Sequence, residues 1–107
     1  MTNENTKLYR IANNLQLVPN TTTDVIAKDC YVYQIVVANL HNSTVTFTVV
    51  DKATSAKTLV PSVSLAANST TVFSFPRGVK MTGGVNWVAS TADKLHASID
   101  AYYAPGA

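Results

Sequence analysis

The chain has 107 residues, of which 47% are hydrophobic and 13% are charged. This length suits one domain with one modest core, and so low a charge leaves neutral polar side chains to cover the surface. The net charge of +2, without a basic cluster, excludes the electrostatic footprint of a nucleic-acid-binding protein. No apolar run is long enough to cross a bilayer, so we expect neither nucleic acid nor a membrane as a partner.

The two ends of the sequence differ from its middle. Residues 1–6 are polar and predict a flexible N-terminal arm, residues 105–107 predict a loose tail, and residues 7–104 predict a single domain. The N-terminal stretch has no apolar segment of the kind that a secretory signal needs. We therefore expect a protein that is made in a cytosol and stays soluble.

The first strong strand signal is Tyr31–Asn39, after weaker ones at Lys7–Ala12 and Thr22–Ala27. The strong segment is apolar on both faces apart from Gln34, which is typical of a central strand covered on both sides or of a strand at a subunit contact. We favour the subunit contact. Tyr31 and Tyr33 share the parity of Ile35 and Val37, which predicts that the two rings pack with these aliphatic side chains. The residues expected at this interface are Tyr31, Tyr33, Gln34, Val36 and Tyr102.

Strict alternation of apolar and polar side chains predicts half-buried strands at Thr44–Asp51 and Lys94–Tyr103. The expected inward sets are Val45, Phe47 and Val49 in the first strand, and Leu95, Ala97, Ile99, Ala101 and Tyr103 in the second.

Two further strong strands are expected at Thr70–Phe75 and Val85–Ser90, and two weaker ones at Lys57–Val60 and Val79–Met81. The core residues that they predict are Val72, Val85 and Trp87.

Turn-forming residues separate these segments, for example at residues 76–78 and at Gly83–Gly84. Their spacing of roughly 8–12 residues is typical of an antiparallel sandwich or barrel. We predict an all-β fold, an antiparallel β-sandwich of jelly-roll or immunoglobulin-like type, with about eight strands and no substantial helix. No helix is expected after the glycine pair, so it predicts a hairpin turn and not a phosphate-binding loop.

Three side chains of the last strand, His96, Ser98 and Asp100, have the types found in a hydrolase triad. Residues two apart on one strand lie roughly 6.5–7 Å from each other, whereas a nucleophile must be about 3 Å from its base. The geometry favours an exposed polar strand face, and we expect no enzyme activity.

No metal or cofactor site is expected. His41 lies in a turn and has no second ligand at a suitable spacing. Cys30 is the single cysteine, which excludes an internal disulfide. A lone cysteine is more often a small buried hydrophobe than a reactive group.

Tyrosines leave an alternative function open, because a flat ring stacks on the face of a sugar. The candidates are Tyr31, Tyr33, Tyr102 and Tyr103. A carbohydrate- or receptor-binding β-sandwich module, with a glycan as ligand, is therefore the second functional hypothesis.

Four segments follow one another in a characteristic order. Ile35–Asn39 ends in Asn, Thr44–Asp51 is rich in Thr and Val, Val63–Thr71 leads to a Ser/Thr turn, and Gly78–Ser90 is a glycine-rich hairpin into an Ala-Ser strand. This order resembles the small β-sandwich accessory proteins of tailed-bacteriophage virions. The resemblance covers roughly residues 30–103 and includes no catalytic signature.

The resemblance implies a virion structural protein. Proteins of this kind occur as head decoration or cement proteins, head-fibre bases and neck or tail components, commonly as homotrimers or larger rings. We expect a non-enzymatic capsid decoration protein, located in the virion, that stabilises the shell by binding adjacent capsomers. Its expected partners are other copies of the chain, with a trimer favoured, and the major capsid protein or another virion protein.

Overall fold

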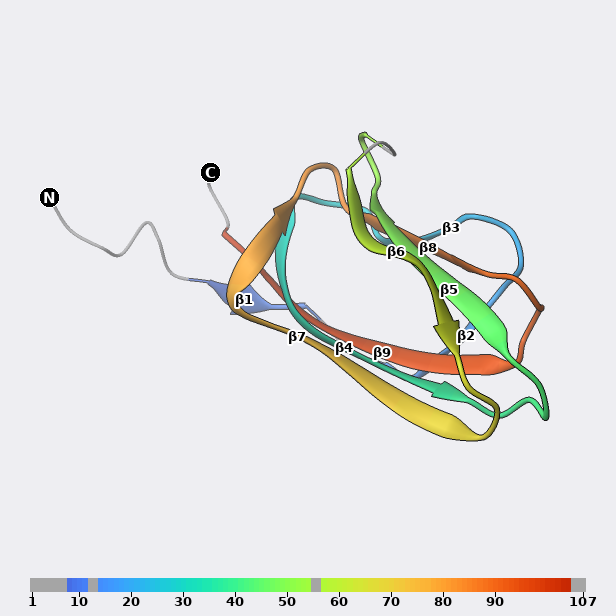
Figure 1. Ribbon diagram of the computed structural model, residues 1–107. Coiled ribbons are helices and arrows are strands. Elements are labelled where there is room, and N and C mark those ends of the chain that lie inside the picture. Colours follow the sequence, from blue (N-terminus) through green and yellow to red (C-terminus); the bar gives the residue numbers. More distant parts are fainter. Residues whose placement is uncertain (1–7, 12–13, 55–56, 105–107) are drawn as a thin grey trace, which may run out of the picture.

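Two antiparallel β-sheets pack face to face (Figure 1). The computed structural model of the chain describes residues 8–11, 14–54 and 57–104. Within these ranges the chain forms no helix, and so none that could cross a membrane. The expected all-β sandwich is confirmed, whereas the expected arm at residues 1–6 and tail at residues 105–107 lie outside the described residues.

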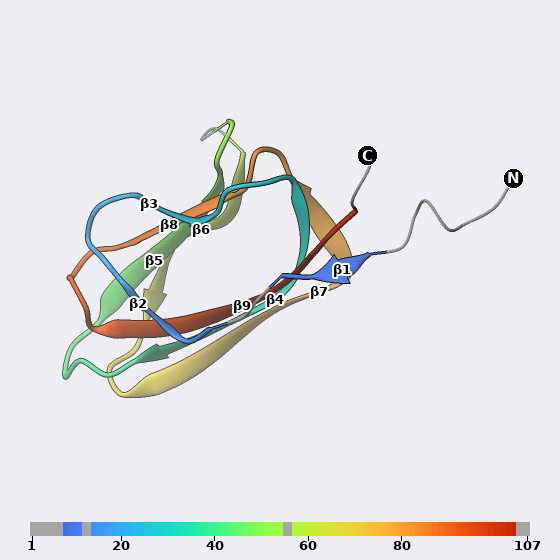
Figure 2. The ribbon, with the colours of Figure 1, turned by 180° about the vertical axis from the view of Figure 1, so that it is seen from behind.

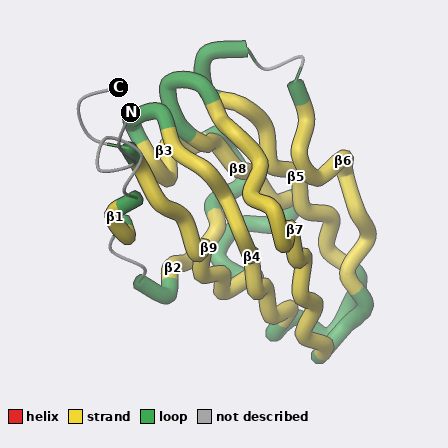
Figure 3. The backbone as a smooth tube through the Cα atoms, turned by 90° about the vertical axis from the view of Figure 1, so that its left-hand side faces the viewer, coloured by secondary structure: helices red, strands yellow, loops and turns green. Residues whose placement is uncertain are grey.

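Sheet A is built around β4 (Cys30–Asn39), which pairs with β7 (Ser69–Met81) on one side and with β9 (Leu95–Tyr103) on the other. Two short strands, β1 (Tyr9–Arg10) and β2 (Gln16–Val18), both pair with the far side of β9. Figure 3 shows β9, β4 and β7 side by side. In this sheet β7 therefore has a paired neighbour on one side only.

Sheet B contains, in order, β3 (Thr23–Ile26), β8 (Val85–Ala89), β5 (Val45–Asp51) and β6 (Thr58–Leu65). From β2 onward the chain crosses to the other sheet at every connection except the β5–β6 hairpin, a path that Figure 2 shows from behind. An immunoglobulin-like sandwich joins several successive strand pairs within one sheet, so the order found here is that of a jelly roll.

Alternate residues of the long strands point into the space between the sheets. The inward sets predicted for Thr44–Asp51 and Lys94–Tyr103 are buried, except that Tyr103 at the strand end is half-buried. Trp87 and Phe47 are the largest fully buried side chains, and their ring centroids lie 5.8 Å apart. The predicted core positions Val85 and Trp87 are confirmed.

The orientation of β7 differs from the prediction. Val72, expected in the core, is 52% exposed on the outer face, whereas Phe73 and Phe75 pack against the core. Alternation separates the valine from the two phenylalanines but does not say which set points inward. Two phenylalanines bury more apolar area than one valine, so they take the inner face.

Strand boundaries also differ from the prediction. Thr70–Phe75 and Val79–Met81 are two parts of one strand, and the expected turn at residues 76–78 is a bulge between them. The strand β2 was not expected, because three residues are too few to show an alternating pattern.

Gly83–Gly84 connects the two sheets and is not the hairpin turn that we expected. The pair lies between β7 of sheet A and β8 of sheet B, so the strands that it joins do not pair with each other. Gly84 has a φ of 127°, and a Cβ there would collide with the carbonyl oxygen of Ile26. The position therefore requires glycine both for its φ and for its lack of a side chain.

Two buried polar side chains tie the sheets together, one at each end of the sandwich. Asn39 ends β4 and is 1% exposed. Its Nδ2 lies 3.0 Å from the carbonyl oxygen of Leu65 and 3.1 Å from those of Ser43 and Ala66. Its Oδ1 accepts a 2.9 Å hydrogen bond from the backbone N–H of His41. The amide thus links the end of β4 to the end of β6.

At the opposite end, Asp51 ends β5 and is also 1% exposed. Its Oδ1 accepts hydrogen bonds from the backbone N–H groups of Ala53 and Thr54, and its Oδ2 accepts one of 2.7 Å from that of Thr82. Burial acts to raise the pKa of Asp51, but these donors and the charge of Lys57 outweigh burial, so the pKa lies below its ordinary value. The carboxylate links β5 to the segment after β7.

Candidate interface surfaces

The outer face of sheet A, which points away from sheet B, carries the five residues predicted for an interface. Tyr31, Gln34 and Val36 project from β4, Tyr102 projects from β9, and Tyr33 lies in a bulge beside them. All five are half-buried within the chain. The structure brings them together on one face, and their role in an interface stays a prediction.

A β-bulge explains why the tyrosines lie on this face. Between Val32 and Gln34 the register against β9 shifts, so that Tyr33 is an extra residue in β4. The shift reverses the side-chain alternation, and Val32 and Ile35 both point inward. The predicted common parity of the tyrosines with Ile35 is therefore wrong, because Tyr31 shares the outer face with Gln34.

Tyr33 is held between two neighbours. Its ring meets that of Tyr102 edge-on, with 5.4 Å between centroids and an interplanar angle of 89°. Gly78, in the bulge of β7, leaves room for the ring, since a Cβ there would lie 2.7 Å from the Tyr33 Cζ. The Tyr33 ring is therefore accommodated where the bulges of β4 and β7 lie side by side.

The centre of the outer face is neutral. Val36 lies directly opposite Val72 of β7, which is 52% exposed, and Leu17 of β2 on the same face is 51% exposed. Charge is found towards the β1 side, where Arg10 Nε lies 3.3 Å from Asp100 Oδ1. Neutral side chains lose less hydration energy than charged ones when they are covered, so this face is suited to contact with another surface.

The apparent triad lies along β9 on the same face. No hydrogen bond joins His96, Ser98 and Asp100 to one another, although all three are described by the structure, and Asp100 pairs with Arg10. Strand geometry holds the three side chains in a row, as the sequence predicts. The row places no nucleophile in contact with a base.

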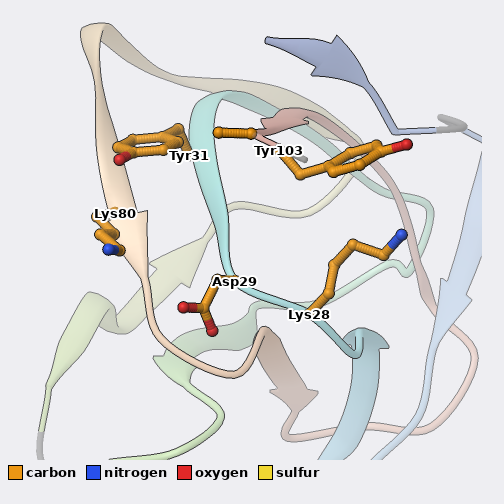
Figure 4. Close-up of a pocket in the computed structure, with 6 residues that line it drawn as sticks. Lys28, Asp29, Tyr31, Lys80 and Tyr103 are labelled. Carbon is orange, nitrogen blue, oxygen red and sulfur yellow. The ribbon is translucent and has the colours of Figure 1, made fainter. Parts of the chain in front are cut away.

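An open hollow of about 300 Å³ lies at one end of sheet A (Figure 4). Tyr31 and Lys80 lie on one side of it, Tyr103 and Lys28 on the other, and Asp29 between them. Lys28 Nζ is 4.3 Å from the centroid of the Tyr103 ring, which is a cation–π contact. The two rings face the hollow from opposite sides and do not form one flat platform.

Cys30 begins β4, and His41 follows the end of that strand. Cys30 is 1% exposed, and burial, followed by the charges of Asp29 and Asp51, raises the pKa of its thiol to about 11. His41 lies in the loop between β4 and β5. Among the residues that the structure describes, no group of three His, Cys, Asp or Glu side chains is placed to hold a metal ion.

Three of the sheet edges in the described ranges are blocked against pairing with another chain. In sheet A, the edge strands β1 and β2 are two and three residues long, and they cover the two ends of β9. In sheet B, β3 is short and has a register shift after Asp24, and β6 contains Pro61 and an irregular Ser62 with a φ of 23°. Proline, irregularities, charge and short length are devices that stop edge strands from pairing.

The fourth edge, β7, lacks these devices over residues 69–75. It pairs with β4 residue by residue from Ser69 to Ser74, and the stretch contains neither charge nor proline. The partly buried Val63, Phe73 and Phe75 pack against the core from β6 and β7. We did not predict this edge from the sequence, although one signal was present: residues 58–76 include no charged residue.

Comparison with known proteins identifies a similar fold. No protein-family model matches the sequence, and no curated protein matches it. A solved chain of the Bacillus endospore appendages, described as a novel family of disulfide-linked pili, superposes with a TM-score of 0.53 over 89% of this chain and 85% of that chain. The two sequences are 14% identical, so the likeness concerns the fold alone.

Proposed function

We propose that this chain is a non-enzymatic structural protein that acts as one of many copies in a surface assembly. Its first form is a capsid decoration protein of a tailed-phage virion, which stabilises the shell by binding adjacent capsomers. The observation that carries the proposal is the neutral outer face of sheet A, which ends at the uncovered edge of β7.

The physical support is the small loss of hydration when such a surface is covered. Val36, Val72 and Leu17 gain from burial, and the serine and threonine hydroxyls around them form hydrogen bonds with many partners. The uncovered backbone groups of β7 add donors and acceptors that a second strand satisfies. A surface of this kind suits a permanent contact better than the transient binding of a charged substrate.

A filament subunit is the second form of the same proposal, favoured by the shared fold with a pilus chain. That protein is described as disulfide-linked, whereas the present sequence contains one cysteine, which is buried. One thiol joins at most one partner, so disulfides within this sequence cannot connect a continuous row of subunits. A filament of this chain would therefore be held by non-covalent contacts and would persist in a reducing agent.

A carbohydrate-binding module is the alternative of a different class, and the hollow between Tyr31 and Tyr103 is the feature that favours it. Lys28 and Lys80 at its rim would suit a sugar that carries a carboxylate. Glycan-array binding that Tyr31→Ala abolishes, and that Tyr33→Ala outside the hollow preserves, would support this alternative over the first proposal.

The first proposal is tested by measuring the mass of the purified chain with light scattering and by mixing it with expanded phage capsids. We expect a homo-oligomer that sediments with capsids and whose mass does not fall as salt is added, because neutral contacts are not screened. Electron microscopy of the concentrated protein separates the capsid-bound form from the filament. A strict monomer that binds no capsid and forms no filament would contradict the proposal.

A further inference from the structure

We infer that two copies of this chain pair through the free edge of β7, antiparallel to each other, about a two-fold axis at Val72. This inference rests on the proposed function and names the partner, the strand and the register. Its starting point is the contrast between the edges. The two short strands β1 and β2 cover the ends of β9, β3 and β6 are irregular, and residues 69–75 of β7 remain regular and open.

The interruptions on either side of the open stretch determine the centre of the pairing. Asn68, with a φ of 53°, forms the turn before β7, and Pro76, which has no backbone N–H, ends the stretch. Val72 lies midway between them. Two strands paired about Val72 place Thr70 opposite Ser74 of the second copy, and the turn of each copy lies opposite the proline of the other, outside the ladder.

The two-fold axis keeps like faces together, because paired residues of an antiparallel ladder point to the same side. On the outer face, Val72 meets Val72 of the second copy. On the inner face, Thr71 meets Phe73 of the second copy. The outer faces of sheet A in the two copies then join into one continuous surface. The partly exposed Phe73 and Phe75 gain apolar cover from the second copy.

Electrostatics permits a second copy as the occupant of this edge. Like charges placed directly opposite each other destabilise a strand pair. Residues 58–76 contain no charge, so two copies in this register bring no like charges together, and Arg77 lies beyond the paired stretch. A self-complementary patch of this kind is what a two-fold homodimer requires.

A matched pair of variants tests the edge. Val72→Lys places two ammonium groups together at the axis, whereas Leu17→Lys adds the same charge at an equally exposed site of the same face, on β2. We expect light scattering to show that Val72→Lys weakens the dimer at least tenfold and that Leu17→Lys leaves it unchanged. Circular dichroism melts of both variants check that each is folded.

A charge exchange tests the two-fold register. Val72→Glu alone is expected to weaken the dimer at least tenfold, as Val72→Lys does, but an equal mixture of the two is expected to form dimers that contain one copy of each. Restored dimers in the mixture also exclude misfolding as the reason for the loss. A mixture that stays monomeric while both variants are folded would overturn the register.

Cysteine cross-linking tests the same register without adding a charge to the edge. In antiparallel pairs the Cα atoms of opposite residues lie about 4.5–5.5 Å apart, within the range of a disulfide, so Val72→Cys should cross-link on oxidation. Thr70→Cys should not, because the two Thr70 positions would lie roughly 14 Å apart. Cys30 is buried and does not interfere.

The outcomes separate this inference from the proposed function. Oligomers that persist in Val72→Lys, a wild-type trimer, or a wild-type monomer that still binds capsids would overturn the β7 pairing and leave the structural role standing. Dimers that dissociate in Val72→Lys, but that neither bind capsids nor build filaments, would support the pairing and contradict the function.

Discussion

The two ends of the sandwich are closed in chemically opposite ways. At one end the amide of Asn39 donates to backbone carbonyl groups, and at the other the carboxylate of Asp51 accepts from backbone N–H groups. Both side chains are 1% exposed and both link sheet A to sheet B. One link is neutral and the other is charged, so the same structural task depends on pH at one end only.

The difference shows that each side chain matches the backbone groups that the fold leaves unpaired beside it. Near Asn39, the end of β6 presents carbonyl oxygens, including that of Leu65. Near Asp51, the loops after β5 and β7 present N–H groups, including that of Thr82. Buried polar groups must be hydrogen-bonded. Carbonyl acceptors at one end therefore call for the N–H donors of an amide, and N–H donors at the other end call for a carboxylate acceptor.

The largest expected effect on stability comes from placing a carboxylate, the group used at the Asp51 end, at position 39. In Asn39→Asp a carboxylate would face carbonyl oxygens about 3 Å away, and we expect a loss of about 4 kcal/mol in unfolding free energy at neutral pH. Asn39→Ala should lose about 2 kcal/mol. Urea denaturation measures both.

Acid provides the control for this prediction. The neighbouring oxygens would raise the pKa of the introduced carboxyl above its unfolded value of about 4. Its destabilisation should therefore be complete above the raised folded pKa, shrink as the pH falls through that value, and be absent below the unfolded pKa, where the group is protonated in both states. An Asn39→Asp protein that is as stable as wild type at neutral pH would show that this amide does not clamp the sheets.

Removing the charged clamp should have the next largest effect. Asp51→Ala leaves three backbone N–H groups without their acceptor, and we expect a loss of about 3 kcal/mol. Asp51→Asn should lose about 2 kcal/mol, because its amide group would face one of the N–H donors. Asp93→Asn is the matched control: Asp93 is exposed with a φ of 60°, which Asn tolerates, so the change should stay within about 0.5 kcal/mol. Equal losses at positions 51 and 93 would contradict the clamp.

A smaller effect is expected from acid on the wild-type protein. The pKa of Asp51 is lowered in the folded state, so its contribution to stability is complete above the unfolded pKa of about 4 and is lost as pH falls through the folded value. Urea midpoints of wild type should therefore fall from neutral to acid pH more than those of Asp51→Asn. Parallel pH profiles for the two proteins would show that Asp51 is not the source of the acid sensitivity.

The smallest expected effect is on the pKa of Cys30, which depends on the charge of Asp51 at one end of the sandwich and not on Asn39 at the other. Its pKa of about 11 is raised in part by the charge of Asp51, after burial and Asp29. Asp51→Asn should therefore lower the pH at which alkylation of the thiol reaches half its maximal rate, as measured by mass spectrometry. Asn39→Ala should leave that pH unchanged, and a shift in both variants would indicate general loosening instead.

Much of the fold could be predicted because strand alternation reports burial directly. The inward residues of β5 and β9 follow the period of two without interruption, and they form much of the core. Alternation gives the wrong face where one extra residue breaks the period of two. Tyr33 is an extra residue in β4, and the bulge places Tyr31 on the outer face with Gln34, whereas alternation alone puts these two residues on opposite faces.

Features that depend on both sheets could not be predicted from one strand at a time. Val72 and Phe73 alternate in the sequence, and only the position of sheet B decides which of them is buried. Asn39 and Asp51 look like ordinary turn residues at strand ends, because the loops that cover them come from distant parts of the chain. The open edge of β7 likewise appears only when the strand order of the sheet is known.

The two-fold geometry of pairing through β7 limits how far association can continue. When two copies pair through residues 69–75, each uses up the one unguarded edge in its described part, and no strand template remains for a third copy. Association through this edge is therefore self-terminating, unlike the open-ended stacking of an amyloid. If the chain is a subunit of an assembly, as proposed, two-fold pairing would protect this open edge from open-ended aggregation before the assembly forms.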